Sequence, residues 1–224
     1  MYKKITHNIV EEHFGMPMYE EMASDGKKKI PTNEIFNQAN FKQDVESYMT
    51  TYGTKLINMI NQLPGTEDDL SLAFEDLFKN IDNLGNMTKP FYASDLAERI
   101  NINMRSIALV TFFALTNLKL GRDPQTNLNR LNTNLADFAF VLSSFNSLWD
   151  NMAVRNILTR LASGLQAKLK AKKEKNASAD QTANSLITEQ LTAFSNAFVN
   201  GIVNKFPERF IKAQTATIAG KDIM

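Results

Sequence analysis

The sequence predicts an all-α protein: a single bundle of about six helices, with an extended N-terminal arm and a short C-terminal tail. From residue 34 onward, apolar residues recur three or four positions apart in almost every segment. That spacing places them on one face of a helix. Gly, Pro and good capping residues fall between these segments. No stretch longer than four residues alternates apolar and polar residues as a half-buried strand would.

The first two predicted helices meet at a Pro-Gly pair. One apolar stripe covers residues 41–63 and ends at Pro64-Gly65. The next helix is predicted to start at Thr66, which can cap the first turn while the side chain of Asp69 bonds back to the backbone. We expect Gly85 to follow the end of this helix as its left-handed residue.

Two further helices follow a loop. Ser94 is a good N-cap for a long helix that reaches Leu120 and is ended by Gly121. Asp123 and Pro124 then suit the N-cap and the first helical position of the next helix.

That next helix carries a heptad pattern. Its apolar residues are spaced alternately by three and four positions: Leu128, Leu131, Leu135, Phe138, Leu142, Phe145 and Trp149. Such a seam can pack inside one bundle or join two chains in a coiled coil. The flanking positions hold Asn, Ser and Thr in place of the Glu and Lys usual in coiled coils. An intramolecular seam is therefore favoured.

The last two helices are predicted over about residues 152–173 and 183–206, with Pro207 ending the second. The small and polar residues between them are predicted to form a linker over 174–183. A domain boundary is possible at 175–183, before the last helix. The helical body thus covers 34–206, and residues 207–224 form the C-terminal tail.

Residues 1–33 are predicted to form an N-terminal docking arm. Their apolar residues follow no sustained period, and glycines and prolines interrupt them. The segment is nevertheless too apolar for a free tail. We expect it to bind a partner surface through Phe14, Met16, Met18, Tyr19 and Ile30.

The charges are nearly balanced, with 25 Lys and Arg against 24 Asp and Glu. This balance argues against a protein that coats nucleic acid through bulk electrostatics. The strongest local charge is the lysine run at 168–175, at a helix C-terminus, where cations complement the helix dipole. The alternative is contact with nucleic acid, or with an acidic partner such as 67–76 of another copy. Its candidate contact residues are Lys168, Lys170, Lys172 and Lys173.

The residues that usually carry catalysis or bind metals are scarce. The chain has no cysteine, and its two histidines, His7 and His13, both lie in the arm. Six residues apart, they do not share a helix face. A glycine-rich phosphate loop and the H-E-x-x-H arrangement are both missing from the sequence. We therefore predict no catalytic residue, no cofactor and no metal site, and a protein that is not an enzyme.

We also expect no membrane span and no secretory signal peptide. The most apolar stretch, residues 107–115, is much shorter than the roughly 20 residues that cross a bilayer. The first residues lack the apolar core of a signal peptide.

These observations predict a structural protein of a large multi-subunit particle. Between residues 101 and 165, Asn, Thr and Ser take the place of most charged residues, so neighbours can cover this surface without burying charge. The Asn-rich, cysteine-free composition and a pI near 7.8 suit a bacteriophage virion component. The expected location is then the virion, after synthesis in the host cytoplasm, and otherwise the cytoplasm.

The expected partners are other subunits of the assembly, including copies of the chain itself. Two alternatives remain open at this point. One is a nucleic-acid-binding or packaging protein that uses the lysine run at 168–175. The other is a helical bundle that binds a small molecule among its Phe and Met residues.

Overall fold

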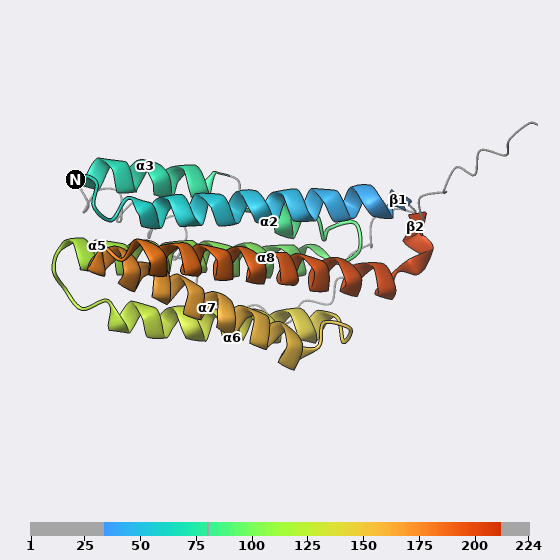
Figure 1. The fold of residues 1–224 in the computed structure, drawn as a ribbon. Helices are drawn as coiled ribbons and strands as arrows, with labels where there is room; N and C mark the ends of the chain where they lie inside the picture. Colours follow the sequence, from blue (N-terminus) through green and yellow to red (C-terminus); the bar gives the residue numbers. More distant parts are fainter. Residues whose placement is uncertain (1–33, 80, 212–224) are drawn as a thin grey trace, which may run out of the picture.

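A computed structural model describes residues 34–79 and 81–211, and six long helices and one short one make up most of them (Figure 1). The helices are α2 (Gln38–Asn61), α3 (Glu67–Phe78), α4 (Asn83–Asn86), α5 (Ser94–Lys119), α6 (Gln125–Phe145), α7 (Asn151–Glu174) and α8 (Ala177–Lys205). The remaining elements are the 3-10 turn η1 (Pro207–Arg209) and two-residue strands β1 (Phe36–Asn37) and β2 (Phe210–Ile211). The predicted all-α bundle is confirmed.

The long helices lie roughly along one axis, around a continuous apolar core (Figure 1). α8 packs against α7 and α2, and α6 packs against α5 and α7. The short α3 and α4 cover α2 and α5. Among residues 34–79 and 81–211, every helix is too short or too polar to span a membrane.

The predicted start of α3 is confirmed as a capping box. The backbone N–H of Asp69 donates to Thr66 Oγ1 at 3.1 Å, and the N–H of Thr66 donates to Asp69 Oδ2 at 2.8 Å. The hydrogen bonds from Thr66 lower the pKa of the Asp69 carboxyl. Three acidic residues in this first turn also complement the helix dipole.

The capping box gives a first test of stability. Replacing Thr66 with Ala removes the side-chain oxygen that accepts the N–H of Asp69, so we expect to lose about 1 kcal/mol of unfolding free energy. Replacing Thr66 with Ser keeps that oxygen and should cost much less. Urea unfolding followed by circular dichroism compares the two variants. Equal losses would show that the hydroxyl contributes nothing as a cap.

The second predicted helix is shorter than expected. α3 ends at Phe78, and Gly85 lies inside the separate helix α4 instead of following a helix end. A Cβ atom on Gly85 would collide with the carbonyl oxygen of Ala97 and with the side chain of Asn101. Glycine is therefore needed here because α4 and α5 approach closely, and the prediction that it caps a helix is wrong.

The predicted bounds of the next two helices are close to those observed. Gly121 follows α5 with φ 67°, in the left-handed region, as predicted. Ser94 begins α5 as its first helical residue, and the N-cap Ala93 makes no side-chain bond. α6 begins one residue later than predicted, and Asp123 Oδ1 accepts the N–H of Gln125 at 3.0 Å.

The heptad seam packs inside the bundle. Its four central members are buried: Leu131, Leu135, Phe138 and Leu142. They belong to the core that α6 shares with α5 and α7. Trp149 lies beyond the end of α6, in the turn that leads to α7, and is also buried.

The linker predicted over 174–183 is wrong, because most of that segment is helix. α7 ends at Glu174, and Lys175 adopts φ 54°, a left-handed residue that turns the chain. Asn176 then caps α8 by accepting the N–H of Ala179 at 3.0 Å. Alanine is the strongest helix former, so a polar, alanine-rich segment can be helical without an apolar stripe. α8 packs in the same apolar core as α7 and α2.

Candidate functional site

The lysine run, the first predicted contact surface, is partly buried. Lys168 is completely buried, and its Nζ lies 2.6 Å from Asp180 Oδ1 in the first turn of α8. Lys172 Nζ lies 2.8 Å from Asp180 Oδ2. Lys168 is not available to a partner, contrary to the prediction, because it shares the apolar face of α7 with Leu165 and Leu169.

Three lysines of the run remain exposed: Lys170, Lys173 and Lys175. Lys170 Nζ lies 4.0 Å from a carboxylate oxygen of Glu174. The acidic segment proposed as its counterpart also makes contacts within the chain, since Asp69 belongs to the capping box and Asp76 pairs with Lys55 at 3.1 Å. Both observations reduce the charge that these two segments offer to another molecule.

The buried ion pair shifts the pKa of both partners. Burial alone would raise the pKa of Asp180, but hydrogen bonds from Lys168 and Lys172 hold it below its ordinary value of 3.8. Burial lowers the pKa of Lys168, and the hydrogen bond to Asp180 opposes that shift. The turn between α7 and α8 therefore depends on the charge of Asp180.

This dependence predicts a loss of stability in acid. As the pH falls below about 4, the unfolded chain takes up a proton on Asp180 more readily than the folded chain, so the unfolding free energy decreases. Urea midpoints measured from about pH 5 to about pH 2 should show this decrease. The variant Asp180→Asn lacks the titrating group, so its midpoint should change less with pH. Identical pH profiles would contradict the prediction.

The two ends of the described chain meet at one end of the bundle. β1 and β2 pair in parallel, with Phe36 opposite Phe210 and Asn37 opposite Ile211 (Figure 1). The guanidinium of Arg209 reinforces the pair, because its Nε–H donates to the carbonyl oxygen of Glu34 at 2.8 Å. Residues almost the whole chain apart are thus fixed side by side.

A phenylalanine cluster anchors this strand pair to the bundle. Its members are Phe36, Phe41, Phe91, Phe206 and Phe210, with ring centroids of contacting pairs 5.0 to 6.5 Å apart. The Arg209 guanidinium lies 5.7 Å from the ring centroid of Phe91 and 6.0 Å from that of Phe36, within cation–π range. The strands are short, so these rings provide most of the attachment.

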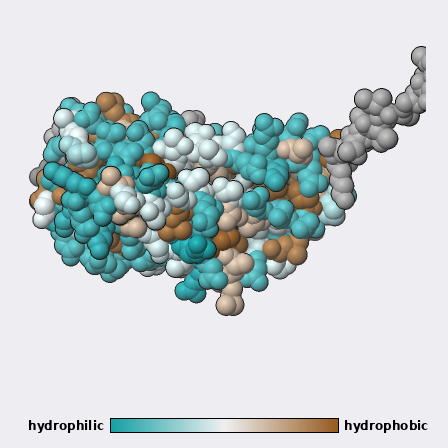
Figure 2. Space-filling model, viewed as in Figure 1, coloured by the Kyte–Doolittle hydropathy of each residue, from teal (hydrophilic) through white to brown (hydrophobic). Residues whose placement is uncertain are grey.

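The strand pair also offers apolar and hydrogen-bonding surface to a partner. Ile35, which precedes β1, is 61% exposed, and Ile211, the last residue of β2, is 58% exposed. In the two-stranded sheet each strand has one neighbouring strand, so both are edge strands. Edge strands can pair with another chain. Elsewhere on the bundle, Figure 2 shows hydrophobic residues at the surface among hydrophilic ones.

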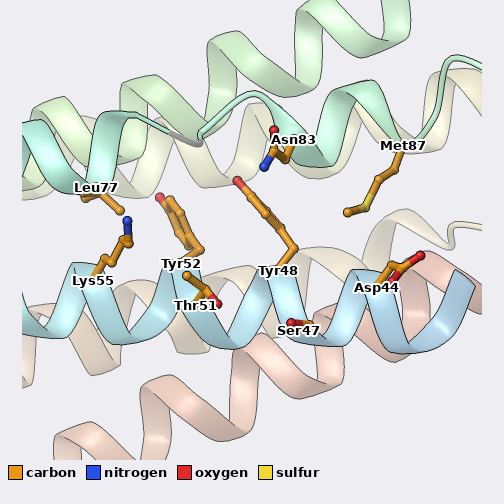
Figure 3. A pocket seen from close by; sticks show the side chains of 9 residues that line it. All are labelled: Asp44, Ser47, Tyr48, Thr51, Tyr52, Lys55, Leu77, Asn83 and Met87. Atoms are coloured by element: carbon orange, nitrogen blue, oxygen red, sulfur yellow. The ribbon is translucent and has the colours of Figure 1, made fainter. Parts of the chain in front are cut away.

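A groove runs along α2 from this end of the bundle. Two hollows, of about 310 Å³ and 410 Å³, follow each other along the helix and share Asp44 and Met87 in their linings. The smaller hollow reaches Ile35 in the chain before β1, and the larger reaches Lys55. We call the two together the α2 groove. Figure 3 shows its larger part, between α2 and the segment that carries α3 and α4.

Two tyrosines form part of the wall of the α2 groove. The hydroxyl of Tyr48 donates to the carbonyl oxygen of Ile81 at 2.9 Å, and that of Tyr52 donates to the carbonyl oxygen of Met104 at 3.4 Å. Burial raises the pKa of both phenols. Both hydroxyls are therefore protonated at neutral pH and connect α2 to neighbouring segments.

The remaining predicted site residues cannot be placed. The arm residues Phe14, Met16, Met18, Tyr19 and Ile30, together with His7 and His13, lie outside the described residues. Within 34–79 and 81–211, no three His, Cys, Asp or Glu side chains form a group that could hold a metal ion.

Comparison of the chain with protein-family models, with curated proteins and with solved structures found no match.

Proposed function

We propose that this chain is a non-enzymatic assembly subunit of a large particle, and that it docks on neighbouring subunits through the arms at both of its ends. The observation that supports this most is the parallel pairing of β1 with β2. Because both strands run the same way, the chain enters β1 on one side of the pair and leaves β2 on the opposite side. One subunit could thus reach neighbours in two directions from one anchored point.

The surface of the bundle supports the same proposal. Large apolar side chains are exposed on α3, on α5, on α6 and at the turn into α7: Leu72, Ile102, Phe140, Leu148 and Met152. The last four of these lie between residues 101 and 165, where few residues are charged. Contact with a neighbour would bury such a surface at little desolvation cost. The particle that suits this composition is a bacteriophage virion.

Truncation of the arms tests the proposal. We expect the full chain to form oligomers in a concentration-dependent manner, and a variant without residues 1–33 and 212–224 to remain monomeric. Light scattering after size-exclusion chromatography measures the mass, and circular dichroism checks that the truncated variant keeps its helices. A full chain that stays monomeric at every concentration, or a truncated chain that assembles equally well, would overturn the proposal.

A matched control addresses the nucleic-acid alternative. Replacing both Lys170 and Lys173 with Ala removes two of the three exposed lysines of the run and leaves the buried pair of Lys168 and Asp180 in place. We expect this variant to assemble as the full chain does. If it instead lost a salt-dependent affinity for nucleic acid, the lysine run would have the binding role.

A further inference from the structure

The α2 groove lies where the N-terminal arm joins the bundle. We propose that this groove is the docking site for the last part of the chain's own arm, residues 24–33. The inference rests on the proposed function in one respect: it says where the arm binds before the arm contacts a neighbouring subunit. The arm would then be held against its own subunit until a neighbouring subunit replaces the groove as its partner.

The position of the groove favours the chain's own arm over that of another copy. Ile35, Phe36 and Asn37 line its smaller hollow, so the arm begins at the mouth of the groove. A short connection of this kind raises the effective concentration of the tethered segment to the millimolar range. An arm from another copy competes only at its concentration in solution.

The length of the groove accommodates most of residues 24–33. From Asn37 to Lys55 the α2 helix rises about 27 Å. An extended chain advances at most about 3.3–3.6 Å per residue, so eight or nine residues span that distance. In this register Ile30 falls beside Ser47, and the lysines at 27–29 fall between Thr51 and Lys55.

The chemistry of the groove suits these residues in that register. Met87 supplies apolar surface on the wall opposite α2, against which the side chain of Ile30 can pack (Figure 3). Pro31 restricts the residue before it to extended backbone, the form that a groove along a helix accommodates.

Acidic side chains lie at two points along the same path. Asp44 is exposed on α2 where the two hollows meet. At the Lys55 end, the exposed Asp76 of α3 pairs with Lys55 at 3.1 Å, so the three consecutive lysines at 27–29 would share that carboxylate with Lys55. The attraction acts between exposed groups, so salt should weaken it.

Disulfide trapping tests the proposal, because the chain has no cysteine of its own. The full chain carrying Ile30→Cys and Ser47→Cys is oxidised at low concentration. Its control carries Ile30→Cys and Lys42→Cys, since Lys42 is exposed on α2, is nearer to the start of the helix than Ser47 and does not line the groove. We expect the first pair to close within one chain at least about tenfold faster than the control. High salt, or replacement of the lysines at 27–29 with Ala, should slow the first pair.

The results for the two cysteine pairs separate the inference from the proposed function. Equal rates of disulfide formation in the two pairs would overturn the inference, and so would a disulfide that forms between two chains. The second result would leave the proposed function standing, because the arm would then dock on a neighbour. Circular dichroism of the reduced variants confirms that the substitutions leave the bundle folded. The proposed function is tested separately, by the light-scattering masses of the full and truncated chains.

Discussion

Replacing Asp180 with Ala is expected to lower the unfolding free energy by about 3–5 kcal/mol. The substitution leaves Lys168 completely buried without the carboxylate that lies 2.6 Å from its Nζ. An unpaired buried charge must lose its proton, find water or open the structure, and each response costs free energy. Lys172 also loses its partner, but it is partly exposed and water can replace the lost contact.

The matched variant is Lys168→Met. It removes the buried cation and keeps an unbranched side chain on the same face of α7, while Asp180 retains Lys172 as its partner. Replacing a buried ion by an apolar group of similar shape is often neutral or stabilising. We therefore expect little loss, or a gain, in urea unfolding at neutral pH. A loss equal to that of Asp180→Ala would show that the ion pair itself stabilises the turn.

The second large effect is expected at Trp149, whose replacement by Ala should cost about 3–5 kcal/mol. The indole ring is buried, stacks on Phe198 with centroids 5.2 Å apart, and donates its Nε1–H to the Phe198 carbonyl oxygen at 3.1 Å. Asn146 Nδ2 donates to the carbonyl oxygen of Gly201 at 2.8 Å beside it. The indole ring and the amide of Asn146 thus connect the α6–α7 turn to α8.

Gly201 provides a second probe of the same contact. A Cβ atom there would collide with the indole ring, which is rigid and enclosed, so Gly201→Ala should cost about 1–3 kcal/mol. Asn200→Ala is the control, because residue 200 is the exposed neighbour in the same helix. Thermal unfolding of Trp149→Ala, Gly201→Ala and Asn200→Ala checks that their losses of stability decrease in that order. Trp fluorescence also follows the unfolding of the two variants that retain the indole. If Gly201→Ala were as stable as Asn200→Ala, the close approach would be of no consequence.

Local signals in the sequence predicted the helices well. The Thr66 capping box, the Gly121 turn and the heptad seam all depend on residues within a few positions of one another, where the physical rules are strongest. The prediction failed at Gly85, which is required by a contact between α4 and α5, and at 174–183, where Asn176 and alanines start a helix that has little apolar pattern. A tertiary contact explains why the residue at position 85 is glycine, and helix propensity explains why 177–183 is helical.

The candidate site was harder to predict. The lysine run was identified from its charge, although Lys168 falls at the spacing that places it beside Leu165 and Leu169 on the apolar face. That spacing indicates that Lys168 is buried. Asp180, twelve residues later, is the acid that pairs with it. The β1–β2 pair had no local signal at all, because each strand has two residues and its partner lies at the other end of the chain.

The parallel register of β1 and β2 also determines how the bundle would bear tension. If neighbours pulled on the chain before Phe36 and after Ile211, the two strands would be drawn past each other along their length. Force in that direction loads the backbone hydrogen bonds together, in shear, and must also drag Phe36 and Phe210 through the surrounding rings. An antiparallel pair would open one bond at a time. Under such a load, the strand pair would resist before the helices behind it were stretched.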